Sequence, residues 1–226
     1  MVSKEFELDG IKIRVIKNKR NRRIRLTISG HEVRVSIPYF VPYFEGLKFA
    51  KSKLDWINTR LKPKTFYCNN QKIGKNHHLV LIPTPTSNNK LSSKISDIFI
   101  YINYPENLDI NDGLIQKYIE TKVNKALKLQ AQILLPKRVK YLAEKYDFNY
   151  QDIYIKKLKT RWGSCDSKMN LTFNLKLMNL DWDLIDYVIL HELTHTKHMH
   201  HQKAFWNELT RISPNAKILR SKLKEC

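Results

Sequence analysis

The chain has 226 residues, of which 42% are hydrophobic and 11% aromatic, so it is long and apolar enough to form a substantial core. Its 41 Lys and Arg residues and 21 Asp and Glu residues give a formal net charge of +20. This charge has two interpretations: a surface that binds nucleic acid or another acidic partner, or a composition that is generally rich in Lys, Asn and Ile. No apolar run approaches the length of a membrane span, the first residues lack the apolar core of a secretory signal, and the three scattered cysteines exclude a disulfide framework, so we expect a cytoplasmic protein without a membrane segment.

Residues 5–37 alternate apolar and polar side chains in three runs separated by turns that contain Asn or Gly. The apolar positions are Ile11, Ile13 and Val15, then Ile24, Leu26 and Ile28, then Val33, Val35 and Ile37. This period of two residues predicts an antiparallel meander with one buried face. The basic residues Arg14, Arg23 and Arg25 are expected on the other, solvated face.

An apolar stripe with helical spacing predicts one helix from Phe44 to Leu61, opened by Pro38 and Pro42 and ended by Pro63. We interpret its aromatic residues, Phe44 and Trp56, as part of the core. Strands are then expected over 66–67, 78–82 and 98–104, with a polar surface loop over 83–93. Because no partner residue lies at ligand spacing, His31, His77 and His78 are interpreted as surface histidines.

The pattern changes from strand to helix near residue 105, which predicts an N-terminal β-rich subdomain with one helix over 1–105 and a second subdomain over 106–226. The second begins with a long helix, N-capped by Asp109 or Asn111 and broken or restarted at Pro136. Strands over 152–159 and 171–177 form a predicted hairpin. A helix N-capped by Asp181 or Asp183 follows, then an amphipathic helix over 202–212, and a tail over 217–226 that is a basic helix or frayed.

The helix after Asp183 carries the sequence His-Glu-Leu-Thr-His at 191–195. Residues i and i+4 of a helix lie on one face, one turn apart, so His191 and His195 can offer two imidazoles to one ion. Zinc accepts neutral imidazole nitrogen, and a catalytic zinc site keeps one position open for water. Glu192 is placed to take a proton from that water.

A third protein ligand is needed, and the position of His198 excludes it if the helix continues. His198 would then lie seven residues from His191, about 10.5 Å along the axis, which is too far for two ligands of one ion. The third ligand should therefore follow the helix end, where the chain turns back, and His200 and His201 are the candidates. We favour His201 because it directly precedes the amphipathic segment from 202 to 212.

These motifs resemble the YgjP-like zinc metallopeptidases, relatives of the SprT and WLM-type zincins. The resemblance rests on the sequences at 161–165 (RWGSC), 171–174, 185–188, 191–195 and 201–206, and it is weaker in the N-terminal half. It implies an α+β fold with a zincin-like catalytic unit built on the active-site helix, behind the N-terminal antiparallel β-rich part. It also implies Zn²⁺ bound by His191, His195 and His201, with Glu192 as the catalytic base. The family usually has Asn-His-Ser where this chain has residues 200–202, His-His-Gln, which is why His200 stays an alternative ligand.

The sequence thus predicts a zinc-dependent peptidase that acts on a peptide or protein substrate. The resemblance implies that the hairpin over 153–177 borders the cleft, where an edge strand could hold an extended substrate. Arg161, or a histidine outside the ligand set, is a candidate to stabilise the oxyanion. The alternatives are a basic nucleic-acid-binding protein with a secondary metal site, a protease acting on DNA-bound proteins, which combines both functions, and a zinc hydrolase of some non-peptide amide. Cys165 as a nucleophile is a weaker one.

Overall fold

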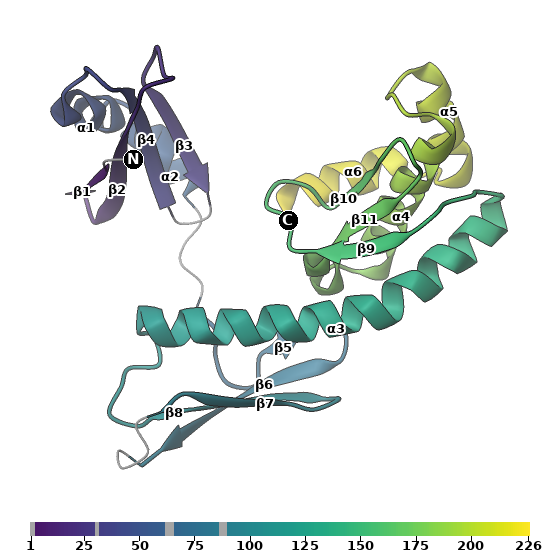
Figure 1. Ribbon diagram of the computed structural model, residues 1–226, viewed down its shortest axis with the longest axis horizontal. Coiled ribbons are helices and arrows are strands. Elements are labelled where there is room, and N and C mark those ends of the chain that lie inside the picture. Colours follow the sequence, from purple (N-terminus) through teal and green to yellow (C-terminus); the bar gives the residue numbers. More distant parts are fainter. Residues whose placement is uncertain (1–2, 30–31, 62–65, 86–89) are drawn as a thin grey trace. The chain divides into compact units, whose positions relative to one another are not determined.

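The computed structural model describes residues 3–29, 32–61, 66–85 and 90–226, in two compact units, Met1–Phe66 and Tyr67–Cys226 (Figure 1). The units divide at residue 66, whereas the sequence predicted a boundary near 105. The strands between these two positions belong with the second unit because their buried residues, such as Leu79 and Ile100, share a core with the helix that follows. The predicted stop at Pro63 and the turn at His31 lie outside the described residues.

The first unit is a four-stranded sheet covered by two helices. Its strands are β1 (Ser3–Leu8), β2 (Ile11–Asn18), β3 (Arg25–Ser29) and β4 (Glu32–Pro38), in the order β1-β2-β4-β3. The predicted meander is therefore wrong in one respect, because β4 inserts between β2 and β3 and pairs with β2 in parallel, with Val15 opposite Val35. Burial explains the order: Ile13 and Val15 of β2 and Val33, Val35 and Ile37 of β4 are fully buried and central, whereas Leu26 and Ile28 of β3 are half-buried at the edge.

The helices α1 (Tyr43–Lys51) and α2 (Leu54–Arg60) replace the single helix that the sequence predicted. The interruption at residues 52–53 resets the helical phase, so that Ala50 and Ile57 are buried but Phe44 and Trp56 are 66% and 37% exposed. The interpretation of these aromatic residues as core is therefore wrong. A Cβ at Gly46 would lie 2.7 Å from Cγ1 of Val15, so the glycine allows α1 to approach the sheet closely.

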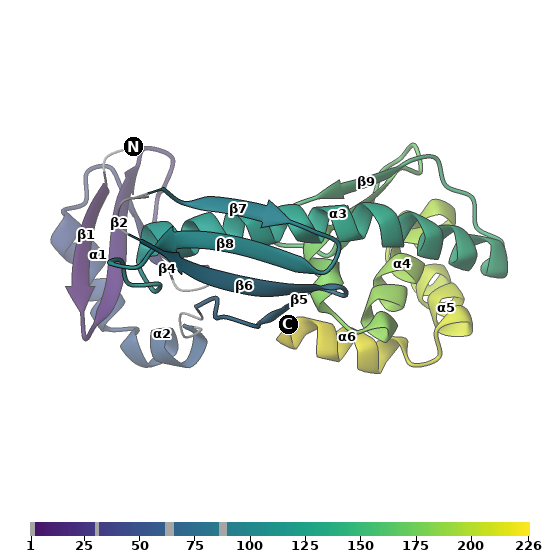
Figure 2. The same ribbon diagram turned by 90° about the horizontal axis from the view of Figure 1, so that it is seen from below.

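The second unit is organised around α3 (Gly113–Tyr146), a helix of 34 residues. One side of its N-terminal half packs on a sheet in the order β5-β6-β8-β7 (Figure 2). These strands are β5 (Lys72–Ile73), β6 (His77–Thr84), β7 (Ser92–Ile95) and β8 (Phe99–Pro105). The N-cap is Asp112, whose side chain accepts a hydrogen bond from the Leu114 amide, rather than either predicted cap.

Pro136 lies inside α3 and does not end it, contrary to the sequence prediction. An internal proline costs a helix about 3 kcal/mol, because one hydrogen bond is lost and the ring meets the preceding turn. Leu135 and Val139 are both fully buried, so core packing on each side of the proline offsets this cost. The ribbon of α3 bends in its C-terminal part (Figure 1), as expected for a helix with an internal proline.

His77 is a buried residue and not the surface histidine that the sequence predicted, with a relative exposure of 6%. Its Nε2 lies 2.9 Å from the Ser96 carbonyl oxygen, and its Nδ1 lies 2.6 Å from Nε2 of Gln130 on α3. Both ring nitrogens are therefore engaged when the Gln130 amide donates to Nδ1 and the imidazole donates from Nε2. This histidine fastens β6 to α3.

The remaining elements surround the C-terminal half of α3. The short strands β9 (Ile153–Lys156), β10 (Gly163–Cys165) and β11 (Leu171–Asn174) form a sheet in the order β10-β11-β9. The predicted hairpin of strands over 152–159 and 171–177 is wrong, because β9 pairs with β11 in parallel and the antiparallel neighbour of β11 is β10. A 3₁₀ helix, η2 (Leu175–Asn179), leads to α4 (Trp182–Lys197), α5 (Lys203–Ile212) and α6 (Ala216–Glu225). No helix in the described part of the chain has both the length and the apolar character needed to cross a membrane.

Candidate metal centre and active-site cleft

Helix α4 carries residues 191–195 in its last turns, with a mostly buried apolar surface before them. Ile185 and Ile189 are fully buried, and Asp181 is the N-cap residue, although its side chain makes no capping hydrogen bond. On α3, Arg138 makes a bidentate ion pair with Asp186 of α4, with Nε 2.7 Å from Oδ1. The core and this ion pair fix the helix that presents the two histidines.

Three imidazoles converge at the end of α4. The ring centroids of His191 and His195 are 5.0 Å apart, and that of His201 lies 5.1 Å from the first and 4.6 Å from the second. One ring nitrogen of each lies within 4.8 Å of the others, and Nε2 of His201 is 3.1 Å from Nε2 of His191. Two imidazole nitrogens bound to one zinc ion at tetrahedral angles are about 3.3 Å apart, so the donor set fits this ion.

The chain reaches His201 because α4 ends before it. His198 is the C-cap, and its carbonyl oxygen lies 3.1 Å from Nδ1 of His195, which can donate to it and leave Nε2 free as a ligand. The indole nitrogen of Trp206 donates to the carbonyl oxygen of His201 at 3.1 Å, and the two rings stack with centroids 5.6 Å apart. His200 is exposed and is not in the convergent group, so the structure brings together the three histidines that the sequence favoured.

The surroundings of these imidazoles favour their neutral, metal-binding form. Burial, with smaller contributions from His195, His201 and Arg220, lowers the pKa of His191 to about 3. Burial also lowers the pKa of His195 and, with Arg220 and His200, the pKa of His201. The Nδ1 atom of His191 is buried without a hydrogen-bond partner among the described residues. Neutral imidazole is the form that binds metal ions.

Glu192 is buried beside the histidines, with a relative exposure of 6%. Burial raises its pKa to about 8, an effect that the positive charge of Arg161 opposes. The carboxylate side chain packs against Gly163 of β10, where a Cβ would lie 2.8 Å from Oε1. A carboxyl group with a pKa near neutrality can both accept and donate a proton.

A cleft of about 660 Å³ opens over these residues. Its walls come from α4, from the segment 158–163 that includes Arg161 and Gly163, and from α6. The contribution of α6 was missed in the sequence analysis, which left residues 217–226 as a basic helix or frayed end. The signal was present, since Leu219 and Leu223, four residues apart, pack against the core and turn Arg220 and Lys224 toward the cleft.

Two further residues differ in importance from what the sequence suggested. Asn174, with a relative exposure of 4%, donates from Nδ2 to the carbonyl oxygens of Leu158 and Arg161 at 2.9 and 3.0 Å, and so shapes the cleft wall. Cys165 is half-buried, and burial raises the pKa of its thiol to about 11, which argues against a nucleophilic role.

Comparison with known proteins agrees with this geometry. A profile of the YgjP-like metallopeptidase domain matches residues 22–226. The chain belongs to the YgjP-like family. The matched domain is a metallopeptidase domain. Membership of this family implies that the YgjP-like chain is a peptidase with a metal ion and with peptide or protein substrates.

Two solved structures are similar to parts of this YgjP-like chain, and both are described as metallopeptidase zymogens. Abylysin of Pyrococcus abyssi is 20% identical, with a TM-score of 0.37, over 40% of this chain and 91% of that one. Jannalysin of Methanocaldococcus jannaschii is 27% identical, with a TM-score of 0.36, over 40% of this chain and 93% of that one. No protein with curated annotation matches the chain.

Proposed function

We propose that this protein is a zinc-dependent peptidase, with His191, His195 and His201 as the metal ligands and Glu192 as the general base. The observation that carries the proposal is the convergence of the three imidazoles within 4.8 Å at the edge of a cleft that also contains Glu192. Three neutral imidazoles are a ligand set that zinc uses in catalytic sites. When bound, the ion supplies Lewis acidity that polarises a carbonyl and lowers the pKa of water.

The protein residues handle the proton and the charge. Glu192 takes a proton from the attacking water and passes it to the amine that leaves when the C–N bond breaks. Arg161 lines the same cleft and carries the positive charge needed to stabilise a developing oxyanion. The strand β10 is an edge of its sheet, and an extended peptide could bind along it by main-chain hydrogen bonds.

Glu192→Gln tests the proposal directly. The amide cannot accept the proton, so we expect kcat to fall by about 10²–10⁴-fold while the purified protein keeps one zinc ion. A variant that cleaves peptides as well as the wild type, or a wild-type protein that holds no zinc at neutral pH, would contradict the proposal. A parallel screen of non-peptide amides separates a peptidase from a hydrolase of another amide at the same site.

The choice between His200 and His201 as third ligand needs its own pair of variants. His201→Ala should lower the zinc affinity by at least about tenfold, because it removes one of three protein ligands. His200→Ala is the matched control, since the side chain is adjacent and exposed but outside the convergent group. If the control loses zinc and the other variant keeps it, the assignment is reversed.

Nucleic-acid contact through the first unit is a second candidate function, favoured by its basic and aromatic surface. Nζ of Lys17 and of Lys19 lie 5.6 and 5.5 Å from the ring of Tyr39, which is 54% exposed, and the adjacent Phe40 is 82% exposed. Lysine cations beside exposed aromatic rings are typical of surfaces that bind single strands. We expect weak binding of a single-stranded oligonucleotide that falls as salt rises and is reduced by Phe40→Ala, and binding insensitive to both would exclude it.

A further inference from the structure

The cleft carries a strong and one-sided charge. Besides the buried Glu192, its charged wall residues are all basic and all exposed: Lys159, Arg161, Lys176, Arg220 and Lys224. None of the five makes a salt bridge with any described residue of the chain. Other arginines of the protein are neutralised, as Arg138 is by Asp186 and Arg211 is by Glu208. Glu192 lies near Arg161 and Glu120 lies near Lys176, but neither carboxylate forms a salt bridge with these cations, so positive charge is in excess along the cleft.

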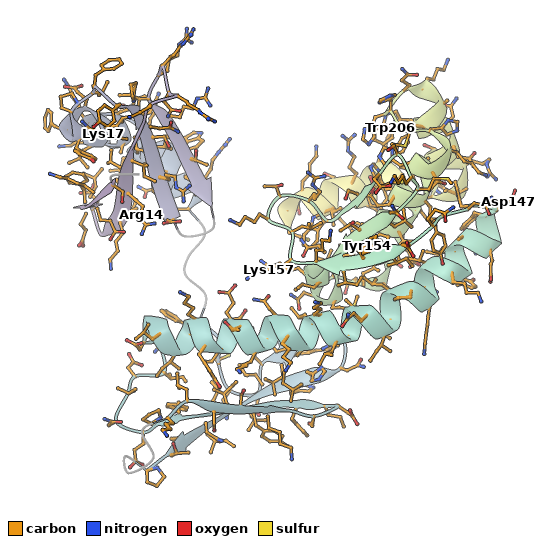
Figure 3. The ribbon with its side chains drawn as sticks, in the orientation of Figure 1. Arg14, Lys17, Asp147, Tyr154, Lys157 and Trp206 are labelled. Carbon is orange, nitrogen blue, oxygen red and sulfur yellow. The ribbon has the colours of Figure 1, made fainter. Side chains whose placement is uncertain are left out.

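Arg220 is held next to the candidate metal ligands. Its guanidinium carbon lies 4.8 Å from the centroid of the Trp206 ring, and that ring stacks on the imidazole of His201. Trp206, which is labelled in Figure 3, is itself fixed, because its Nε1 donates to the carbonyl oxygen of His201. A cation held on an aromatic face keeps its planar donors available for a carboxylate, so Arg220 is already positioned for an anionic ligand.

The backbone that carries two other cations is equally fixed, through Asn174. The Asn174 side chain donates to the carbonyl oxygen of Arg161 and accepts a hydrogen bond from the amide of Lys176 at 3.2 Å. Its own amide donates to the carbonyl oxygen of Trp162 at 2.9 Å. One buried asparagine thus holds the backbone at Arg161 and Lys176, which line the cleft together with Arg220 of α6.

We infer that the cleft selects acidic peptide segments, with Asp or Glu side chains near the bond to be cleaved, and that Arg220 and Lys224 are determinants of this specificity. The inference rests on the proposed function and names its substrate class. The inference rests on where these cations lie, because five basic residues and one buried carboxylate line the cleft that also contains His191 and His201. A peptide carboxylate near several unpaired cations gains attraction that a neutral side chain lacks.

The test compares peptides that differ only in charge. Zinc-loaded wild-type protein is assayed on matched peptides with Glu, Gln or Lys at the positions flanking a common core. We expect kcat/KM for the Glu series to exceed that for the Gln series by at least about tenfold. This ratio should shrink as salt rises from about 50 to about 500 mM, because salt screens the partly exposed charges. Equal or greater cleavage of the Gln or Lys series overturns the inference.

Charge-reversed variants assign the preference to the cleft. Arg220→Glu and Lys224→Glu should each lower the Glu-to-Gln ratio by about tenfold or more, and the first should raise cleavage of the Lys series. Lys222→Glu is the matched control, because it makes the same charge change on α6 but does not line the cleft, and its ratio should stay at the wild-type value. A control that changes the ratio as much as the cleft variants overturns the assignment to these residues.

A binding measurement separates failure of this inference from failure of the proposed function. The Glu192→Gln variant is titrated with fluorescent Glu, Gln and Lys peptides and with a single-stranded oligonucleotide of equal charge. Tighter binding of the Glu peptide by about tenfold, lost in the double variant with Arg220→Glu, supports the acidic cleft even if no peptide is hydrolysed. Preference for the oligonucleotide over the Glu peptide at this site would overturn it. Absence of hydrolysis in every peptide series contradicts the peptidase proposal alone.

Discussion

Gly163 on β10 lies directly against the side chain of Glu192 on α4. A Cβ at residue 163 would be 2.8 Å from both Cγ and Oε1 of Glu192, closer than carbon atoms approach in folded proteins. The φ angle of Gly163 is not in the left-handed region, so the position needs glycine for space rather than for backbone conformation. The space at β10 thus decides where the proposed general base can lie.

Gly163→Ala should therefore impair catalysis without removing the metal. The added methyl group must displace the Glu192 carboxylate. A well-placed general base increases the reaction rate by about 10²–10⁴-fold, and a misplaced base loses part of this increase. We expect kcat/KM to fall by about 10–100-fold with the zinc content unchanged. Gly113→Ala is the control, because a Cβ there meets no atom within 4 Å. Wild-type activity in Gly163→Ala would show that the carboxylate position observed here is not the active one.

The stability of the metal-free protein should depend on pH in two opposite ways. The pKa of His191 is lowered to about 3, so between that value and 6.5 the unfolded chain binds more protons and stability rises with pH. The pKa of Glu192 is raised to about 8 from 4.5, so across this second window the native protein binds more protons and stability falls as pH rises. Between about pH 4.5 and 6.5 the two contributions oppose each other, so together they predict a broad maximum of stability over this range in unfolding experiments on the protein without zinc.

Glu192→Gln isolates the second contribution. The amide carries no charge to bury, so the metal-free variant should unfold at a higher temperature than metal-free wild type at pH 8–9, by about 2–4 °C for each kcal/mol recovered. At about pH 4 and below, the carboxyl of the wild type is protonated in both the native and the unfolded chain, so the two melting temperatures should agree there. The measurement is a thermal melt with chelator across this range. A difference that grows toward acid pH would contradict the raised pKa.

The candidate site was largely predictable from the sequence because helical spacing alone brings residues 191 and 195 to one face. His198 lies outside the convergent group, but the distance argument that set it aside assumed a continuing helix, whereas α4 ends at Lys197 and His198 is its C-cap. The role of Gly163 could not be predicted, because it depends on a contact between β10 and α4 that no local pattern encodes. Asn174 and Arg220 were missed for the same reason, since each acts across the cleft wall through tertiary contacts.

The fold was less predictable where packing overrides local rules. Proline statistics predicted a break at Pro136, but the buried neighbours keep α3 continuous. Alternation correctly predicted the buried face of the first sheet, yet periodicity carries no information on strand order, and β4 lies between β2 and β3. The histidine at 77 was taken for a surface residue because its partner Gln130 is 53 residues away in the chain.

Asn174→Ala should destabilise the protein and loosen the cleft wall. The substitution leaves the carbonyl oxygens of Leu158 and Arg161 without their donor, at a cost of about 1–3 kcal/mol. We expect a lower midpoint in urea and a higher KM for acidic peptides. Asn103→Ala is the control, because its side chain donates to the exposed Ser92 hydroxyl and to no other described residue, and it should change stability by less than about 0.5 kcal/mol. Equal effects of the two substitutions would mean that the wall is not held by Asn174.

The ion pair between Arg138 and Asp186 should stabilise the packing of α3 on α4. The pair is bidentate, and its side chains are 37% and 22% exposed. After allowance for solvent screening, we expect a coupling energy of about 1–2 kcal/mol, which is larger than the about 0.2–1 kcal/mol of exposed pairs. A double-mutant cycle with Arg138→Ala and Asp186→Ala in urea measures it. Lys140 and Glu144 on α3 are the comparison, because this pair is 3.8 Å apart and 71% and 67% exposed. Its coupling should be only about 0.3–0.5 kcal/mol, and a coupling between Arg138 and Asp186 no larger than this would mean that apolar packing alone holds α4 in place.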